Sequence, residues 1–112
     1  MQLQFYWDSE GTPRAQCDPP GSTVADFLES DVQGSLELAH EILRALDRID
    51  AGTIDSWEVT GNAHTLTLSK QGVAIQSEVD EDAGPMLLAK SQFREVMAGW
   101  VSFVGRTRTS TD

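Results

Sequence analysis

Carboxylates are the most abundant side chains in this sequence that could take part in chemistry. The chain has 18 acidic and 8 basic residues, with two histidines and one cysteine. Nucleophilic catalysis needs a serine or cysteine within reach of a base that a third group holds in place. Cys17 is followed by Asp18-Pro19-Pro20, and no basic residue adjoins it in the sequence. The sequence therefore predicts no catalytic residue, and we expect a protein that is not an enzyme.

Two short segments resemble parts of metal-binding motifs. The segment from His40 to Arg44 begins like the zinc-protease helix motif, but Arg44 stands where the second histidine must be. Asp80 and Asp82, followed by Gly84, form a fragment of a calcium loop without its later glutamate. We therefore predict no metal site and no cofactor, and we interpret His64 as a strand-end residue bonded to backbone or water.

Two groups of carboxylates are candidates for binding a basic protein, one within residues 26–41 and one within residues 80–82. The net charge of −10 repels nucleic acid and anionic membranes, and it speeds encounters with basic proteins. The alternative is that these acids only keep the protein soluble. The predicted partner-binding residues are Asp26, Glu29, Asp31, Glu37, Glu41, Asp80, Glu81 and Asp82.

Three segments have the pattern of helices. Residues 35–49 place eight apolar side chains on one half of the helical wheel and polar ones on the other, with Gly52 as a stop. A shorter helix is expected from Ser22 or Thr23 to about Glu29. Ser91 is the predicted cap of a last helix with an apolar stripe that includes Trp100.

Alternating apolar and polar residues predict the strands. Leu3 to Trp7 and Arg14 to Cys17 form a predicted hairpin. Residues 56–60, 64–69 and 73–79 form a predicted meander, and residues 86–89 a short edge strand. We therefore expect an α+β fold: a single antiparallel β-sheet of five to six strands, hairpin plus meander, with two to three helices packed on one face. Residues 1–105 are the predicted single domain and residues 106–112 a flexible C-terminal tail.

Composition also bears on the expected location. A single cysteine makes no internal disulfide, which is typical of a reducing compartment. The first residues lack the basic start and long apolar stretch of a signal peptide. We therefore expect a cytoplasmic monomer or homodimer that binds neither nucleic acid nor a membrane.

The segment from Ser56 to Leu68, followed by Val73 to Glu81, resembles the YacL family of small bacterial proteins. The shared pattern is a tryptophan strand, a Gly-Asn turn, a Thr-Leu strand, an apolar strand and an acidic stretch. The closing helix from Phe93 to Val104 and the middle helix fit as well. The resemblance implies no established activity and no catalytic residues.

These observations lead to competing functional hypotheses. The first is an immunity or inhibitor protein that neutralises a basic, nuclease-like toxin domain by masking its active site, because a site that holds phosphate must be cationic. The alternative is a YacL-type housekeeping protein without catalytic activity, acting as a small-ligand binder or homodimer. A third hypothesis is an enzyme that uses a carboxylate pair.

Overall fold

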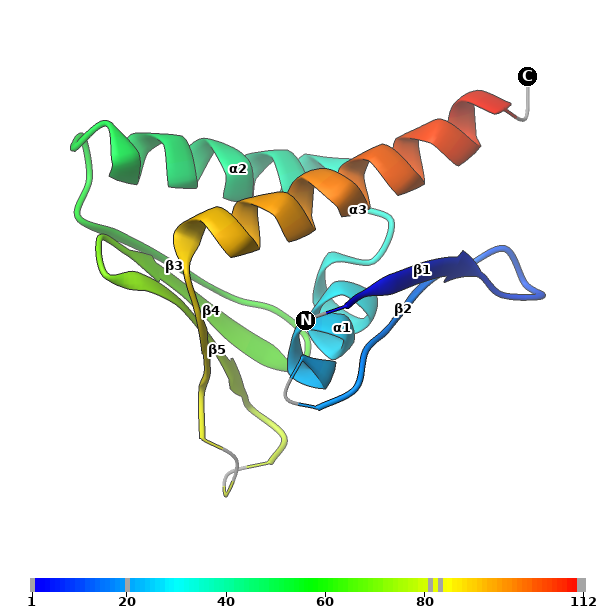
Figure 1. The fold of residues 1–112 in the computed structure, drawn as a ribbon, viewed down its shortest axis with the longest axis horizontal. Helices are drawn as coiled ribbons and strands as arrows, with labels where there is room; N and C mark the ends of the chain where they lie inside the picture. The colour runs from blue at the N-terminus through cyan, green and yellow to red at the C-terminus, as the bar shows by residue number, and fades with distance from the viewer. Residues whose placement is uncertain (1, 20, 81, 83, 111–112) are drawn as a thin grey trace.

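The computed structural model describes residues 2–19, 21–80, 82 and 84–110, with side chains as far as Gly105. Its elements follow one another along the chain as shown in Figure 1. They are β1 (Gln4–Trp7), β2 (Pro13–Gln16), α1 (Ser22–Phe27), the π-helix η1 (Leu28–Val32), α2 (Leu36–Asp50), β3 (Ser56–Thr60), β4 (His64–Ser69), β5 (Gly72–Ser77), β6 (Met86–Leu88) and α3 (Lys90–Ser110).

The strands form two antiparallel sheets, so the prediction of α+β class is confirmed and the prediction of a single sheet is wrong. One sheet has four strands in the order β3-β4-β5-β6, and the other is the hairpin β1-β2. The hairpin packs its apolar face on α3 instead of joining the larger sheet. Phe5 lies 5.1 Å from Trp100 and 5.6 Å from Phe103 between ring centroids. These aromatic contacts hold the hairpin against α3 without any pairing between the sheets.

Helix α2 agrees closely with the helix predicted over residues 35–49. The Ser35 side chain accepts a hydrogen bond from the Leu38 amide at 3.2 Å and so caps the N-terminus. Gly52 has a φ of 78°, a left-handed conformation that favours glycine just after a helix. The buried side chains all come from the predicted apolar half: Ala39, Ile42, Ala45, Leu46 and Ile49.

The hydrophobic core lies between the four-stranded sheet and the helices. Helices α2 and α3 contact each other, α2 contacts β4, and both α1 and α3 contact β5 (Figure 1). Alternate strand residues point into this core, and Leu66, Leu68 and Ile75 are fully buried. Trp100 is also buried, and its indole N–H donates to the carbonyl oxygen of Gln33 at 2.8 Å. Each such large apolar side chain contributes about 1.5–3 kcal/mol through burial.

Helix ends and the connection before α2 differ from the sequence-based expectations. The short first helix continues into η1, a π-helical turn that ends at Val32 and is followed by Gln33, which has a φ of 53°. Helix α3 begins at Lys90, one residue before the predicted cap. It continues to Ser110 through most of the predicted tail, whose last two positions lie outside the described residues. Within the described chain, no helix is both long and apolar enough to cross a membrane.

Candidate binding surface

Asp31, one of the predicted partner-binding residues, is a buried structural carboxylate. Its side chain is 1% exposed. It accepts hydrogen bonds from the backbone amides of Ala63 at 3.1 Å and His64 at 2.9 Å. The Nδ1 atom of the His64 ring lies 3.5 Å from the same carboxylate. Asp31 therefore fixes the β3–β4 turn to η1 and offers no oxygen to a partner.

Gly61 opens this turn and leaves the space that Asp31 occupies. A Cβ atom at position 61 would lie 2.6 Å from Asp31 Oδ2, which is closer than atoms pack. The next residue, Asn62, donates its side-chain amide to the carbonyl oxygen of Ser30 at 2.9 Å. The glycine is therefore required by the close approach of the carboxylate.

Glu29, a second predicted partner-binding residue, joins η1 to β2. Its carboxylate accepts from the Ala15 amide at 2.8 Å and from Arg14 Nη2 at 3.2 Å. The hydrogen bond from Arg14 to Glu29 is the main cause that raises the pKa of the guanidinium. Asp8 also contacts Arg14, at 3.5 Å, and the pKa of Asp8 is lowered chiefly by the backbone N–H of Thr12. Glu29 therefore stabilises the edge of β2.

The other predicted partner-binding residues are spread over the surface. Exposed side chains are those of Asp26, Glu37, Glu41, Asp80 and Asp82. Glu81 lies outside the described residues. Within residues 26–41, the Glu29 and Asp31 carboxylates thus bind the protein's own backbone, and the other three carry the exposed charge. Partner binding by the predicted residues stays a prediction.

Carboxylates at the end of α2 are matched by cations of α3. Arg94 contacts Asp47 at 2.7 Å and Asp50 at 2.8 Å, and Lys90 contacts Asp50 at 2.8 Å. The hydrogen bond from Lys90, followed by that from Arg94, lowers the pKa of Asp50. Charge is balanced here, so this part of the surface has little attraction for a basic partner.

The outer face of the four-stranded sheet has a different character. In the described chain no helix lies over it, because all the helices pack on the other face (Figure 1). We call it the open face. Thr65 donates to Glu78 at 2.5 Å, and Thr67 donates to Glu58 at 3.4 Å. Its outward positions hold hydroxyls, small side chains, one amide, one leucine and two carboxylates, but no basic residue: Ser56, Glu58, Thr60, Thr65, Thr67, Ser69, Gly72, Ala74, Gln76, Glu78 and Leu87.

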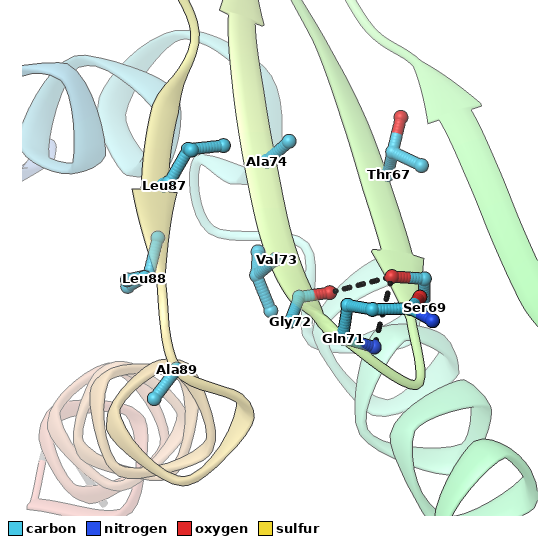
Figure 2. Close-up of a pocket in the computed structure, with 9 residues that line it drawn as sticks. All are labelled: Thr67, Ser69, Gln71, Gly72, Val73, Ala74, Leu87, Leu88 and Ala89. Carbon is cyan, nitrogen blue, oxygen red and sulfur yellow. Dashed lines mark hydrogen bonds between the residues drawn. The ribbon is translucent and has the colours of Figure 1, made fainter.

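A shallow groove of about 380 Å³ crosses one end of the open face. Thr67, Ala74 and Leu87 are cross-strand neighbours on β4, β5 and β6. The small side chain of Ala74 leaves a hollow, and Figure 2 shows the Leu87 side chain directed towards it. Leu87 is 68% exposed, although it is a large apolar residue. A mainly apolar hollow with two hydroxyl groups in its lining is suited to binding.

The chemically reactive residues outside the open face form no complete site in the described residues. His64 is buried and meets Phe27 edge-on, with ring centroids 6.1 Å apart. Its ring faces Asp31, which the sequence did not predict. No group of three His, Cys, Asp or Glu side chains is placed to hold a metal ion in the part of the chain that the structure describes.

Sequence reasoning identified the open face as the polar side of the meander but did not select Glu58, Glu78 or Leu87 as binding residues. The available signal was the alternation itself, which places both glutamates outward among threonines. Leu87 could have been found in the same way. It lies between Met86 and Leu88 in the predicted edge strand, so its side chain points to the opposite face of the sheet from theirs.

Comparisons with known proteins identify the chain at the level of family. No curated protein and no solved structure matches it. Residues 1–83 match the model of the uncharacterised protein family UPF0231. The match covers the elements from β1 to β5 and ends before β6. The chain therefore belongs to the uncharacterised protein family UPF0231.

Proposed function

We propose that this chain is an acidic protein-binding module, an immunity or inhibitor protein that neutralises a basic, nuclease-like toxin domain in the cytoplasm. The observation that carries the proposal is the open face. It holds Glu58 and Glu78, has no basic side chain at its outward positions, and no described helix packs on it. A surface of this kind attracts a cationic partner before contact is made.

Masking a nuclease site requires charge and shape together. The site of a nuclease is cationic because it binds phosphate, so carboxylates can occupy the position of the substrate's charge. Leu87 adds an exposed apolar contact on the same face, at the rim of the groove, with Thr67 and Ala74 between it and Glu58. Apolar contacts stabilise a complex after electrostatic attraction has speeded its formation.

The test begins with a partner captured from the source cell and then measures its association rate with matched charge variants. Glu58→Gln with Glu78→Gln removes two charges from the open face but keeps an acceptor for each threonine. Glu37→Gln with Glu41→Gln removes two exposed charges from α2 as the control. We expect the first pair to slow association several-fold and the control pair to have a smaller effect. Both effects should vanish near 0.5 M salt, where screening lengths fall to about 4 Å.

Equal losses from both pairs would mean that net charge alone steers the encounter, and the open face would be dropped. An association rate that is the same for all variants and at all salt concentrations would contradict the proposal of a basic partner.

A second candidate function is a small-ligand binder of the YacL type without catalytic activity. The groove beside Leu87 favours it, because its volume of about 380 Å³ lies within the range of small-molecule sites. Ligand binding there should raise the melting temperature of the wild-type chain and not of Ala74→Leu, which fills the groove. A metabolite screen in which both proteins respond alike would exclude the groove as the site.

A further inference from the structure

The hydrogen-bond pattern of the four-stranded sheet shows which backbone groups face outward at β6. The Glu78 amide donates to the Ala63 carbonyl at 2.8 Å, so residues 63 and 78 form a hydrogen-bonded pair. Such pairs alternate with non-bonded ones along an antiparallel ladder. Thr67 pairs with Ala74 in this register, so the N–H and C=O groups of Ala74 point towards β4. The N–H and C=O groups of its neighbours on β5, Val73 and Ile75, point towards β6.

The same alternation continues into β6. Val73 pairs with Leu88 and Ile75 pairs with Met86, so the backbone groups of these two β6 residues face β5. The N–H and C=O of Leu87, which lies between them, face away from the sheet. Because β6 ends the strand order, no described strand takes up these groups. Leu87 thus combines an exposed apolar side chain with an open pair of backbone hydrogen-bonding groups.

A second groove, of about 710 Å³, adjoins β6 on the side of the N-terminal hairpin. Leu87 lines it, and so do the polar side chains of Gln2, Gln4, Gln16 and Asp18. Glutamine amides both donate and accept hydrogen bonds and can therefore match the groups of a peptide backbone. Asp18 is exposed, and the described lining contains no basic residue, so the groove favours a cation.

We propose that this groove receives an extended, lysine- or arginine-containing segment of the basic partner, which adds a strand to β6 at Leu87. This inference rests on the proposed function and names the way in which the partner binds. Added strands gain affinity from main-chain hydrogen bonds and specificity from alternate side chains. Here one face of the added strand would meet the Leu87 side chain, and a cation at the groove would meet Asp18.

A single segment fits this groove better than a second copy of the chain. A second copy that paired through its own β6 would bring its β5 as well, and each strand takes about 4.8 Å of width. The hairpin that carries Gln2, Gln4 and Gln16 forms part of the groove and limits that width. Each copy also carries a charge of −10, which opposes self-association.

The experiment titrates the full chain with a capped hexapeptide of alternating lysine and valine and follows backbone amide signals by nuclear magnetic resonance. We expect hydrogen exchange at the Leu87 amide to slow at least roughly ten-fold at saturation. The same peptide methylated on alternate backbone nitrogens is the control, because it keeps the charge and loses the donors. Equal binding of both peptides, or no binding at millimolar concentration, would overturn the proposal.

Variants separate the backbone contact from the side-chain contacts. Leu87→Pro removes the outward N–H but leaves the pairing with β5 intact, because edge strands tolerate proline where the N–H faces outward. Leu87→Pro should lower the affinity for the peptide roughly five- to ten-fold more than Leu87→Ala does. Asp18→Asn should weaken binding at low salt, whereas the matched change Glu10→Gln, at an exposed position in the β1–β2 turn, should not. Circular dichroism of each variant checks that it is folded.

Further outcomes distinguish this inference from the proposed function. If the captured partner binds Leu87→Pro as tightly as Leu87→Ala but loses affinity with the open-face glutamine variants, strand addition is wrong and the acidic module stands. If strand addition holds but the partner's association ignores salt, the proposed function fails instead. A concentration-dependent dimer in which the Leu87 amide is protected without peptide would assign the edge to a second copy and overturn the proposed occupant.

Discussion

Removing the carboxylate of Asp31 is predicted to destabilise the protein strongly. In Asp31→Ala the amides of Ala63 and His64 lose their acceptors, at 3.1 Å and 2.9 Å, in a place where water has little access. A hydrogen bond to a charged group contributes about 1.5–3 kcal/mol, so the two bonds together contribute about 3–6 kcal/mol. A chain of this length has a free energy of unfolding of roughly 6–17 kcal/mol, so the loss is a large fraction of it.

Urea denaturation followed by circular dichroism measures this loss, with Asp26→Ala as the matched control. Asp26 lies five positions earlier on α1 and is exposed, so its replacement should change the free energy of unfolding by less than about 0.5 kcal/mol. Hydrogen exchange at Ala63 and His64 should also accelerate in Asp31→Ala. A loss below about 1 kcal/mol for Asp31→Ala would refute the assignment of Asp31 as the anchor of the β3–β4 turn.

The remaining predictions concern the core, the strained backbone and acid stability. Leu46→Ala and Trp100→Ala should each lower the free energy of unfolding by about 2–5 kcal/mol in chemical denaturation, because both side chains are fully buried; less than about 1 kcal/mol for both would contradict the helix faces. Gln33→Gly should be more stable than Gln33→Ala by about 1–2 kcal/mol, since both lose the side chain but only alanine keeps the strain of a φ of 53°; equal urea midpoints would show that the strain is absent. The lowered pKa of Asp50 means that its ion pairs stabilise the fold above the unfolded pKa, near 3.9, and that this stability is lost as the pH falls through the lower folded value. Asp50→Asn should therefore flatten the decline of the melting temperature below about pH 4, and an unchanged decline would contradict this contribution.

Local patterns predicted most of the secondary structure because local physics determines it. The apolar half of residues 35–49 and the capping oxygen of Ser35 are both encoded within a few positions, and α2 follows them closely. The strands of the meander are likewise marked by alternation and by tight turns. The π-helical turn η1 has no comparable local mark. The residue that follows it, Gln33, is held by a distant contact: its carbonyl accepts from the indole of Trp100, 67 positions away.

The candidate surface was predicted less well, because the role of a carboxylate depends on distant partners. Glu29 and Asp31 look like Glu37 and Glu41 in the sequence, since all four are acids at polar positions. What separates them is the arrival of β2 and the β3–β4 turn next to η1, which brings backbone amides to the first two. Sequence separation between donor and acceptor is 14 and 33 positions. Charge counting over residues 26–41 therefore overstated the acid available to a partner.

The division into two sheets follows from the same competition between local and distant contacts. Alternation marks β1 and β2 as strands but says nothing about which edge they join. The aromatic side chains of β1 meet α3, with Trp7 stacked on Phe103 at 5.1 Å, and this packing holds the hairpin apart from β6. A single continuous sheet would have satisfied the backbone of Leu87 internally. Because the hairpin instead binds the helix, that backbone pair remains at an edge beside a polar groove, where a strand from another protein can supply what the fold itself does not.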